Sequence, residues 1–209
     1  MIALIPARLG SKRFPGKNRA SFRGKSLLSI ANQTAIESGV LEGVYLSTDD
    51  DLLIREANNL GISVPFKRDT NIAQDGTSTW EVVRDFLTRT GYVGDICLLQ
   101  LTSPLRESKD ISNLYRIYKS NDSNRALTVC NETIAGSLRN DWLCECSDII
   151  SSIQHCQNSH PVLPNGSVYM LKSTSSLNEP YSPLVGSSGL VMPQERSLDV
   201  DYAHQLENY

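Results

Sequence analysis

Short apolar runs alternate with amphipathic stretches along most of the chain. Buried strands are predicted at the apolar runs 2–5, 44–47, 62–66, 95–101, 126–130, 166–171 and 189–193. Helices are predicted where apolar residues have helical spacing, at 26–38, 52–60, 77–90, 111–119 and the C-terminal 201–209. This alternation indicates βαβ units and therefore an α/β fold, a three-layer α/β/α architecture with a mostly parallel central sheet.

The 209 residues are predicted to form a single domain, residues 1–209, long enough to bury a sizeable core without disulfides. The periodicity is lost at about 131–163, where polar residues and cysteines predominate. This part is predicted to be a short irregular insertion.

The composition is that of a soluble globular protein, with 40% hydrophobic and 21% charged residues. Lys and Arg number 20 against 23 Asp and Glu, and the net charge of −3 argues against a general nucleic-acid binder. No apolar run approaches the ~20 residues of a membrane-spanning helix, and the N-terminus lacks the features of a signal peptide. We therefore expect a cytoplasmic protein with neither nucleic-acid nor membrane partners.

The cysteines agree with that location, because five is an odd number and favours reduced thiols. Cys144 and Cys146, together with Cys156, His155 and His160, could form a metal cluster. Their spacing fits none of the common zinc patterns, so no structural metal is predicted there.

A basic loop follows the first predicted strand, in the segment IPARLGSKRFPGKN. A Walker A loop has four residues between its glycines and a hydroxyl after its lysine; here five residues separate Gly10 from Gly16, and Asn18 follows Lys17. The glycines still let the backbone approach a phosphate, and the cations converge at one loop: Arg8, Lys12, Arg13 and Lys17. The loop is predicted to bind a triphosphate; the alternative is a solvated basic turn.

Two helix starts carry local signals. Asp50 and Asp51 follow the second predicted strand and could bind a metal ion, but they suit a helix N-terminus, and capping is the favoured interpretation. Ser78 is followed three residues later by Glu81, as in a capping box.

Two more polar segments fall at predicted strand ends, where open α/β sheets bind ligands. In LLQLTSPLR, Gln100 is a candidate ligand contact, and Arg106 is either a ligand contact or a structural pin. In RSLDVDY, Asp199 and Asp201 alternate by two and would share one face of a strand. Such a pair suits Mg²⁺ that holds substrate phosphates; the alternative is two exposed edge-strand carboxylates.

These segments resemble those of the N-acylneuraminate cytidylyltransferases, or CMP-sialic acid synthetases, a family with relatives acting on legionaminic and pseudaminic acids. IPARLGSKRFPGKN is similar to the family's signature loop, STDD to its second strand end, LLQLTSPLR to its central motif, NGSVYM to its NGAIY element and SLDVD to its SIDID metal motif. The motifs occur in family order across nearly the whole chain. CMP-Kdo synthetases share the fold and a similar loop, but PGKN and LLQLTSPLR are more similar to the sialic branch. The resemblance implies an α/β fold of the nucleotide-diphospho-sugar transferase type.

The resemblance also implies a reaction and its residues. The anomeric hydroxyl of a sialic-acid-like nonulosonic acid would attack the α-phosphorus of CTP, giving a CMP-sugar for surface glycans and pyrophosphate. Arg8, Lys17 and Asp201 would be catalytic, and Asp199 and Asp201 would bind Mg²⁺. The substrate contacts would be Ser11, Lys12, Arg13, Asn18, Arg68, Ser78, Thr79, Gln100, Arg106 and Asn165, with Asn18, Arg68 and Ser78–Thr79 at the cytidine and Gln100 at the sugar acid. A homodimer is implied as well.

One region departs from the family. Before the NGAIY element, family enzymes carry arginines that would meet the sugar's carboxylate. Here Leu163 takes the place of the arginine before PNG, and no Arg or Lys occurs from Asp141 to Met170. Either another nonulosonic acid is held differently, with His155 or His160 as a partial cation, or the sugar half is degraded. The insertion that builds a dimerisation arm in the family is also short here.

Three functions therefore remain open: a cytidylyltransferase for a nonulosonic acid, a nucleotidyltransferase of the same fold with another acceptor, and a catalytically silent nucleotide-binding paralogue. The missing basic pocket favours the second. The retained cations and carboxylates weigh against the third.

Overall fold

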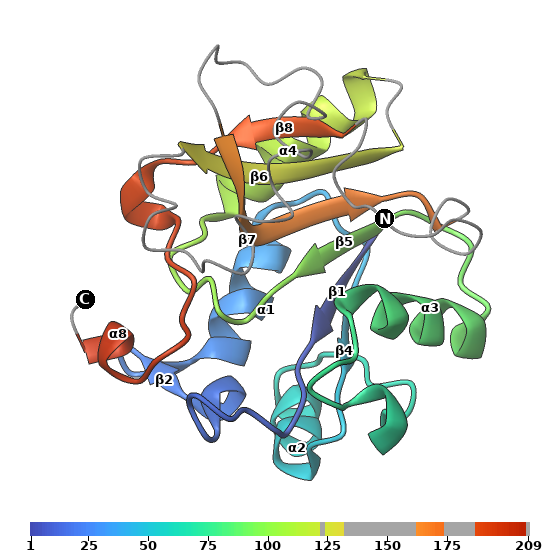
Figure 1. Cartoon of the computed structure of the whole chain (residues 1–209). Helices are drawn as coiled ribbons and strands as arrows, with labels where there is room; N and C mark the ends of the chain where they lie inside the picture. The colour runs from blue at the N-terminus through green and yellow to red at the C-terminus, as the bar shows by residue number, and fades with distance from the viewer. Residues whose placement is uncertain (122–123, 132–161, 174–186, 208–209) are drawn as a thin grey trace.

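The computed structural model describes residues 1–121, 124–131, 162–173 and 187–207. These residues form a six-stranded sheet in the order β4-β1-β5-β7-β6-β8 (Figure 1). The strands are β1 (Ile2–Pro6), β4 (Val44–Ser47), β5 (Ile96–Leu99), β6 (Arg125–Asn131), β7 (Val162–Leu171) and β8 (Ser188–Val191). β7 is antiparallel to β5 and β6, whereas the other neighbouring pairs are parallel. The prediction of a mostly parallel sheet is confirmed.

Helices cover both faces of this sheet. On one face, α1 (Leu27–Glu37), α2 (Asp51–Asn59) and α4 (Ser108–Ser120) pack against strand residues that include Ile5 and Leu99. On the other face, α3 (Thr79–Thr90) packs against residues that include Leu4 and Leu98. Successive strand residues point to opposite faces, so β1 and β5 contribute to both cores. The described residues therefore form the three predicted layers (Figure 1).

Smaller elements connect these layers. β2 (Ser21–Phe22) pairs with β3 (Lys25–Ser26) in a short hairpin. Single 3₁₀ turns occur at η1 (Lys17–Arg19), η2 (Thr70–Ile72) and η3 (Gln194–Arg196), and the described chain ends in α8 (His204–Glu207).

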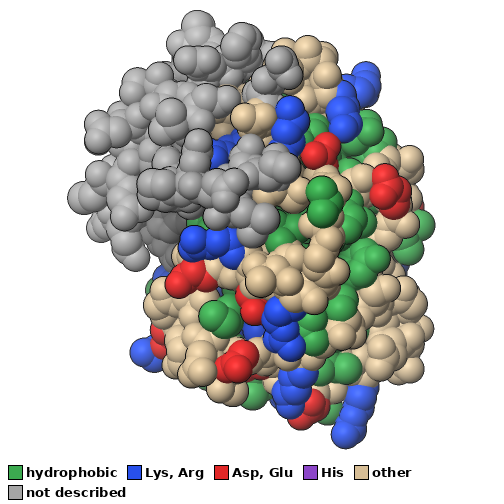
Figure 2. Space-filling view, turned by 90° about the vertical axis from the view of Figure 1, so that its right-hand side faces the viewer, with side chains coloured by type: hydrophobic (Ala, Val, Ile, Leu, Met, Phe, Trp, Pro, Cys, Tyr) green, Lys and Arg blue, Asp and Glu red, His purple; other side chains and the backbone are tan. Residues whose placement is uncertain are grey.

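No described helix has both the length and the apolar character required to span a bilayer. On the face that carries α3, charged side chains of both signs are interspersed (Figure 2).

The two helix starts signalled in the sequence are confirmed. Asp50 caps α2 by accepting a hydrogen bond from the backbone N–H of Leu52. Ser78 and Glu81 form both halves of a capping box at the start of α3. Gly61 follows α2 with φ +72°, the left-handed conformation that glycine adopts without a Cβ clash.

Two predicted strands are wrong. Residues 62–66 make only one bridge to the edge strand, between Tyr45 and Ser63, and Pro65 supplies no N–H to continue the ladder. Residues 199–201 do not lie alongside a strand but cross beyond the end of β5. Val200 donates to the backbone oxygen of Thr102, so this segment is tied to a turn. Of the predicted insertion at about 131–163, residues 132–161, with the cysteines and histidines named there, lie outside the described residues. Residues 162 and 163 belong to the strand β7.

Candidate active site

An open cavity of about 500 Å³ lies beyond the carboxyl ends of β1 and β5, the edge where α/β sheets bind ligands. Three parts of the chain line it: the end of β1 with the basic loop, the stretch from Arg68 through η2 into the first turns of α3, and the turn after β5. The lining residues are Pro6, Arg8, Gly10, Ser11, Lys12, Arg13, Lys17, Asn18, Arg68, Ile72, Gln74, Asp75, Thr77, Thr79, Val82, Gln100, Leu101 and Thr102.

Carboxylates at the end of β4 anchor both ends of the basic loop. The backbone N–H of Leu9 donates to Asp49 Oδ1 at 2.8 Å. At the other end, Arg19 Nη2 donates to Asp50 Oδ1 at 2.7 Å, and Asp50 is only 1% exposed. Gly16 turns the loop with φ +74°. The loop's cationic side chains are thereby held above the cavity.

Asp201 meets two cations of this loop. Lys17 Nζ lies 3.1 Å from Asp201 Oδ1, and Arg13 Nη1 lies 3.3 Å from Asp201 Oδ2. Lys17 and Asp201 are mostly buried, with side chains 17% and 13% exposed, so solvent screens their attraction weakly. The two segments that the sequence singled out for phosphate and metal binding thus meet at one place.

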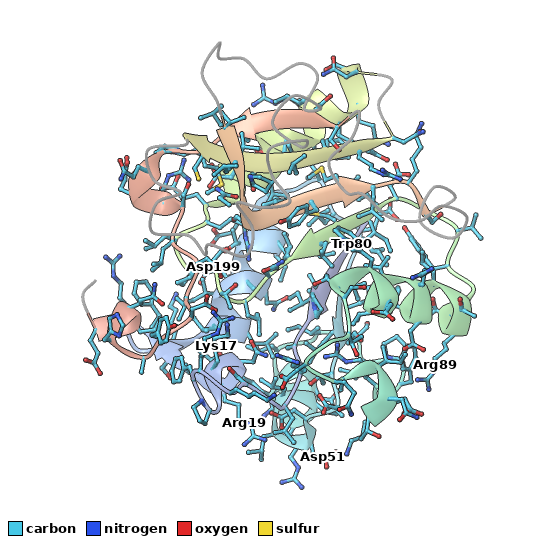
Figure 3. The ribbon with its side chains drawn as sticks, viewed as in Figure 1. Lys17, Arg19, Asp51, Trp80, Arg89 and Asp199 are labelled. Atoms are coloured by element: carbon cyan, nitrogen blue, oxygen red, sulfur yellow. The ribbon has the colours of Figure 1, made fainter. Side chains whose placement is uncertain are left out.

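The acidic turn, defined here as Asp199–Asp201, is held by its neighbours. Gln205 Oε1 accepts the backbone N–H of Asp201 at 2.7 Å, and Val200 is completely buried. Burial raises the pKa of Asp199, and the nearby charge of Asp201 raises it further, while the Thr102 hydroxyl and Lys17 act in the opposite direction. In Figure 3, Asp199 and Lys17 lie on the same side of the molecule, beyond the sheet edge.

The acidic turn fits a magnesium ion that is shared with a substrate. No cluster of three or more His, Cys, Asp or Glu suited to a metal ion occurs within the described ranges. Mg²⁺ is usually bound by one or two carboxylates together with substrate phosphates and water, rather than by an all-protein cage. Asp199 and Asp201 supply two such carboxylates beside the cationic loop, and the desolvated charge of Asp199 would be stabilised by a cation.

Arg68 is a buried cation at the cavity wall. It is 4% exposed, and its Nε and Nη2 atoms have no hydrogen-bond partner within the described part of the chain. Burial lowers the pKa of the guanidinium, whereas the charges of Asp49 and Asp85 raise it. Buried donors are normally satisfied, so two open donors at a cavity wall indicate a place for ligand acceptors.

A family model described as cytidylyltransferase matches residues 2–158 of this chain. The chain belongs to the cytidylyltransferase family. Pseudaminic acid cytidylyltransferase of Campylobacter jejuni is 31% identical, with 99% of this chain and 93% of the relative covered. CMP-N,N'-diacetyllegionaminic acid synthase of Legionella pneumophila is 29% identical, with 96% and 90% covered. N-acylneuraminate cytidylyltransferase of Streptococcus agalactiae is 30% identical over 96% of this chain and 50% of the relative.

Solved structures share the fold of this cytidylyltransferase. CMP:2-keto-3-deoxy-manno-octonic acid synthetase complexed with CTP has a TM-score of 0.73 and 15% identity, with 99% of this chain and 95% of that chain covered. 4-Diphosphocytidyl-2C-methyl-D-erythritol synthase has a TM-score of 0.64 and 12% identity, with 99% and 94% covered. The expected nucleotide-diphospho-sugar transferase type of fold is confirmed.

Most of the predicted site residues of this cytidylyltransferase line the cavity. Asp199 and Asp201 are not among the lining residues; the acidic turn reaches the cavity through the contact of Asp201 with Lys17. Arg106 does not line the cavity either. It is 4% exposed, and its Nη1 donates to the backbone oxygens of Gln100 at 3.2 Å and Ser167 at 2.8 Å. Burial lowers its pKa to about 10. These contacts favour the structural-pin interpretation, in which Arg106 joins the end of β5 to β7.

Ser78 and Asn165 also lie off the cavity lining. The Ser78 side chain is engaged in the cap of α3. Asn165 is 2% exposed and accepts from the Thr128 hydroxyl at 2.7 Å, while its Nδ2 lies 3.1 Å from Ser197 Oγ. Both side chains are therefore placed to position neighbouring segments, and Asn165 links the sheet to the chain that leads into the acidic turn.

Several lining residues were missed from the sequence, among them Gln74, Asp75 and Thr77. They lie between η2 and α3. Gln74 and Asp75 fall in a stretch with neither strand nor helix periodicity, whereas Thr77 was predicted as the first residue of a helix that begins only at Thr79. The capping box at Ser78 was the signal available, because residues just before a helix start lie at its N-terminus, where anions bind.

Proposed function

We propose that this protein transfers CMP from CTP to the anomeric hydroxyl of a sialic-acid-like nonulosonic acid, releasing pyrophosphate, for surface glycan biosynthesis. The observation that carries this proposal is the contact between Lys17 and Asp201, which joins the cationic loop to the acidic turn at the cavity. The names of the relatives support the nonulosonic acid as acceptor. A cytoplasmic location and a homodimer belong to the same proposal.

The arrangement suits attack on a phosphorus atom, a reaction whose catalysis is mostly positioning and charge neutralisation. The anomeric oxygen forms a bond to the α-phosphorus as the bond to the pyrophosphate oxygen breaks, and the hydroxyl proton is released to water. Arg8 and Lys17 would neutralise the phosphate oxygens, with Ser11 beside them, and Arg68 would donate to the nucleotide. Asp199 and Asp201 would hold Mg²⁺, which supplies charge neutralisation and fixes the triphosphate.

A second candidate is a nucleotidyltransferase of the same fold with a different acceptor. Leu163, which stands where the family carries an arginine, is 5% exposed within β7. On the described wall near Gln100, the lining residues Leu101 and Thr102 are uncharged. An acceptor without a carboxylate would therefore meet no unpaired cation at this wall.

A pyrophosphate-release assay with CTP, Mg²⁺ and a panel of acceptors separates these functions. Turnover with sialic, legionaminic or pseudaminic acid is expected. Turnover with other sugars alone supports the second candidate. CTP binding without turnover on any acceptor contradicts both and supports a silent paralogue.

A further inference from the structure

Asp75 bridges two cations of the basic loop. Its Oδ1 lies 2.8 Å from Arg8 Nη1, and its Oδ2 lies 2.6 Å from Lys12 Nζ. Asp75 belongs to the segment between η2 and α3, not to the loop, and all three residues line the cavity. One carboxylate thus spans two cations across the site.

A phosphate group would meet these two cations in a similar way. Two oxygens of one anion each take one cation, as two terminal phosphate oxygens would. The hydrogen bond from Lys12 and the charge of Arg8 lower the pKa of Asp75, so the carboxylate is ionised at neutral pH. Arg8 and Lys12 are two of the cations expected to meet the triphosphate, and the same donors cannot serve both anions fully.

The surrounding backbone is held by other bonds. The N–H of Ala73 donates to the oxygen of Thr70, and the N–H of Thr77 donates to the oxygen of Gln74. Gln74 Nε2 also donates to the oxygen of Thr70 at 2.6 Å. The Asp75 side chain is 42% exposed, so its substitution leaves these contacts in place.

We propose that Asp75 is a displaceable internal counterion of the triphosphate site. It pairs with Arg8 and Lys12 in the empty enzyme, gives them up when the β- and γ-phosphates bind, and takes them back when pyrophosphate leaves. Asp75 therefore weakens the binding of triphosphate and pyrophosphate and eases product release. This inference rests on the proposed function.

The opposite role makes the opposite prediction. If Asp75 were a positioning residue that orients Arg8 and Lys12 for the phosphates, its removal would weaken binding. If it is a competing anion, its removal strengthens binding, because the phosphates no longer displace an ion pair. The sign of the change separates the two roles.

The test is calorimetric titration of the full chain with CTP and Mg²⁺, and separately with pyrophosphate and Mg²⁺. The variants are Asp75→Asn, which keeps the shape but removes the charge, and Asp75→Glu, which keeps the charge. Asp51→Asn is the matched control: Asp51 also uses both oxygens in an ion pair, at 2.7 Å and 2.8 Å from Lys67 Nζ, and lies away from Lys17 and Asp199 (Figure 3). It makes the same change in net charge.

For Asp75→Asn we expect both ligands to bind roughly threefold to tenfold more tightly, the range that two partly exposed ion pairs can supply. Asp75→Glu and Asp51→Asn should stay within about twofold of the wild type. Unchanged or weaker pyrophosphate binding by Asp75→Asn overturns the inference.

A separate outcome tests the proposed function. If the wild type binds pyrophosphate but not CTP, while Asp75→Asn still binds pyrophosphate more tightly, the nucleotide assignment fails and the role of Asp75 stands. If neither ligand binds the wild type, both fail.

Discussion

Lys17 Nζ and Asp201 Oδ1 are 3.1 Å apart, although 184 positions separate the two residues in the sequence. The chemistry of each segment can be predicted from its own residues. The loop contains glycines and cations, and the segment near the C-terminus contains alternating carboxylates. Their contact joins a cation that we propose binds phosphate to a carboxylate that we propose binds Mg²⁺. At the scale of single residues, this pair carries most of the functional argument.

Replacing Lys17 by Ala should weaken CTP binding by roughly tenfold to a hundredfold, because a mostly buried cation is lost from the site. Titration calorimetry measures this change. Lys25→Ala is the control, since Lys25 Nζ instead lies 2.9 Å from Gln33 Oε1, away from this cavity. An unchanged affinity in Lys17→Ala would return the loop to a solvated basic turn.

Replacing Arg68 should weaken ligand binding without lowering the stability of the fold. Arg68→Met should lower the affinity for CTP by about tenfold, yet leave the melting temperature within about 2 °C, because a desolvated and incompletely bonded cation contributes little stability. Calorimetry and thermal unfolding measure the two effects. Arg89→Met is the control. Arg89 lies on α3, and its guanidinium is 3.6 Å from the centroid of the Phe66 ring. A large loss of stability with normal affinity would make Arg68 structural.

The residues that sequence reasoning missed show where the local signal ends. Gln74 and Asp75 are polar residues in an irregular segment, and the sequence alone does not distinguish such residues from those of a solvated turn. Thr77 was assigned to the predicted helix 77–90, which in the structure begins at Thr79. Their function depends on the arrangement of η2 and α3 against the loop, which is a tertiary property. Arg106, conversely, stands in a strong motif, but its burial makes it a pin.

At the scale of elements, the sequence was most informative where a structure is specified locally. The capping box at Ser78 and the cap at Asp50 formed as predicted, because a cap depends on residues within one turn. The two failed strands, 62–66 and 199–201, are extended segments. Whether an extended segment joins a sheet depends on a partner edge and on free backbone donors, and neither is visible in a short sequence window.

Asp50 caps α2 and also pairs with Arg19 at the end of the basic loop. Two variants of Asp50 should therefore separate the contributions of these two contacts to the free energy of unfolding. Asp50→Asn keeps an acceptor for Leu52 but loses the charged pair with Arg19, and should cost about 1 kcal/mol of unfolding free energy. Asp50→Ala loses both and should cost about 2–3 kcal/mol. Urea unfolding gives these values; equal costs for the two variants would contradict the separation.

The same variants predict a pH dependence. Burial raises the pKa of Asp50, but the hydrogen bonds from Arg19 and Leu52 together lower it below 3.8. A carboxyl with a lowered folded-state pKa contributes its full stability above the unfolded-state value and loses it as the pH falls below that value. The stability difference between wild type and Asp50→Asn should therefore be constant near neutral pH and shrink below 3.8. A difference that grows in acid would contradict the assignment.

For the molecule as a whole, the periodicity of apolar residues was enough to predict the three layers and the parallel part of the sheet. It did not predict that β7 runs antiparallel between β5 and β6. The direction of a strand does not follow from its own periodicity, and the sequence before β7, residues 132–161, carries no strand or helix pattern. The reversal matters for function, since β7 carries Asn165, which bonds Ser197 on the way into the acidic turn.

Titration of CTP with and without Mg²⁺ measures whether the cationic loop and the acidic turn close on one magnesium nucleotide, as we propose. In the wild type, Mg²⁺ should tighten CTP binding by about tenfold or more. In the double variant Asp199→Asn/Asp201→Asn, CTP without Mg²⁺ should bind more tightly than it does to the wild type, because two carboxylates that repel the triphosphate are gone. Adding Mg²⁺ should increase the affinity of this variant for CTP only a little. A double variant that responds to Mg²⁺ as the wild type does would contradict the account.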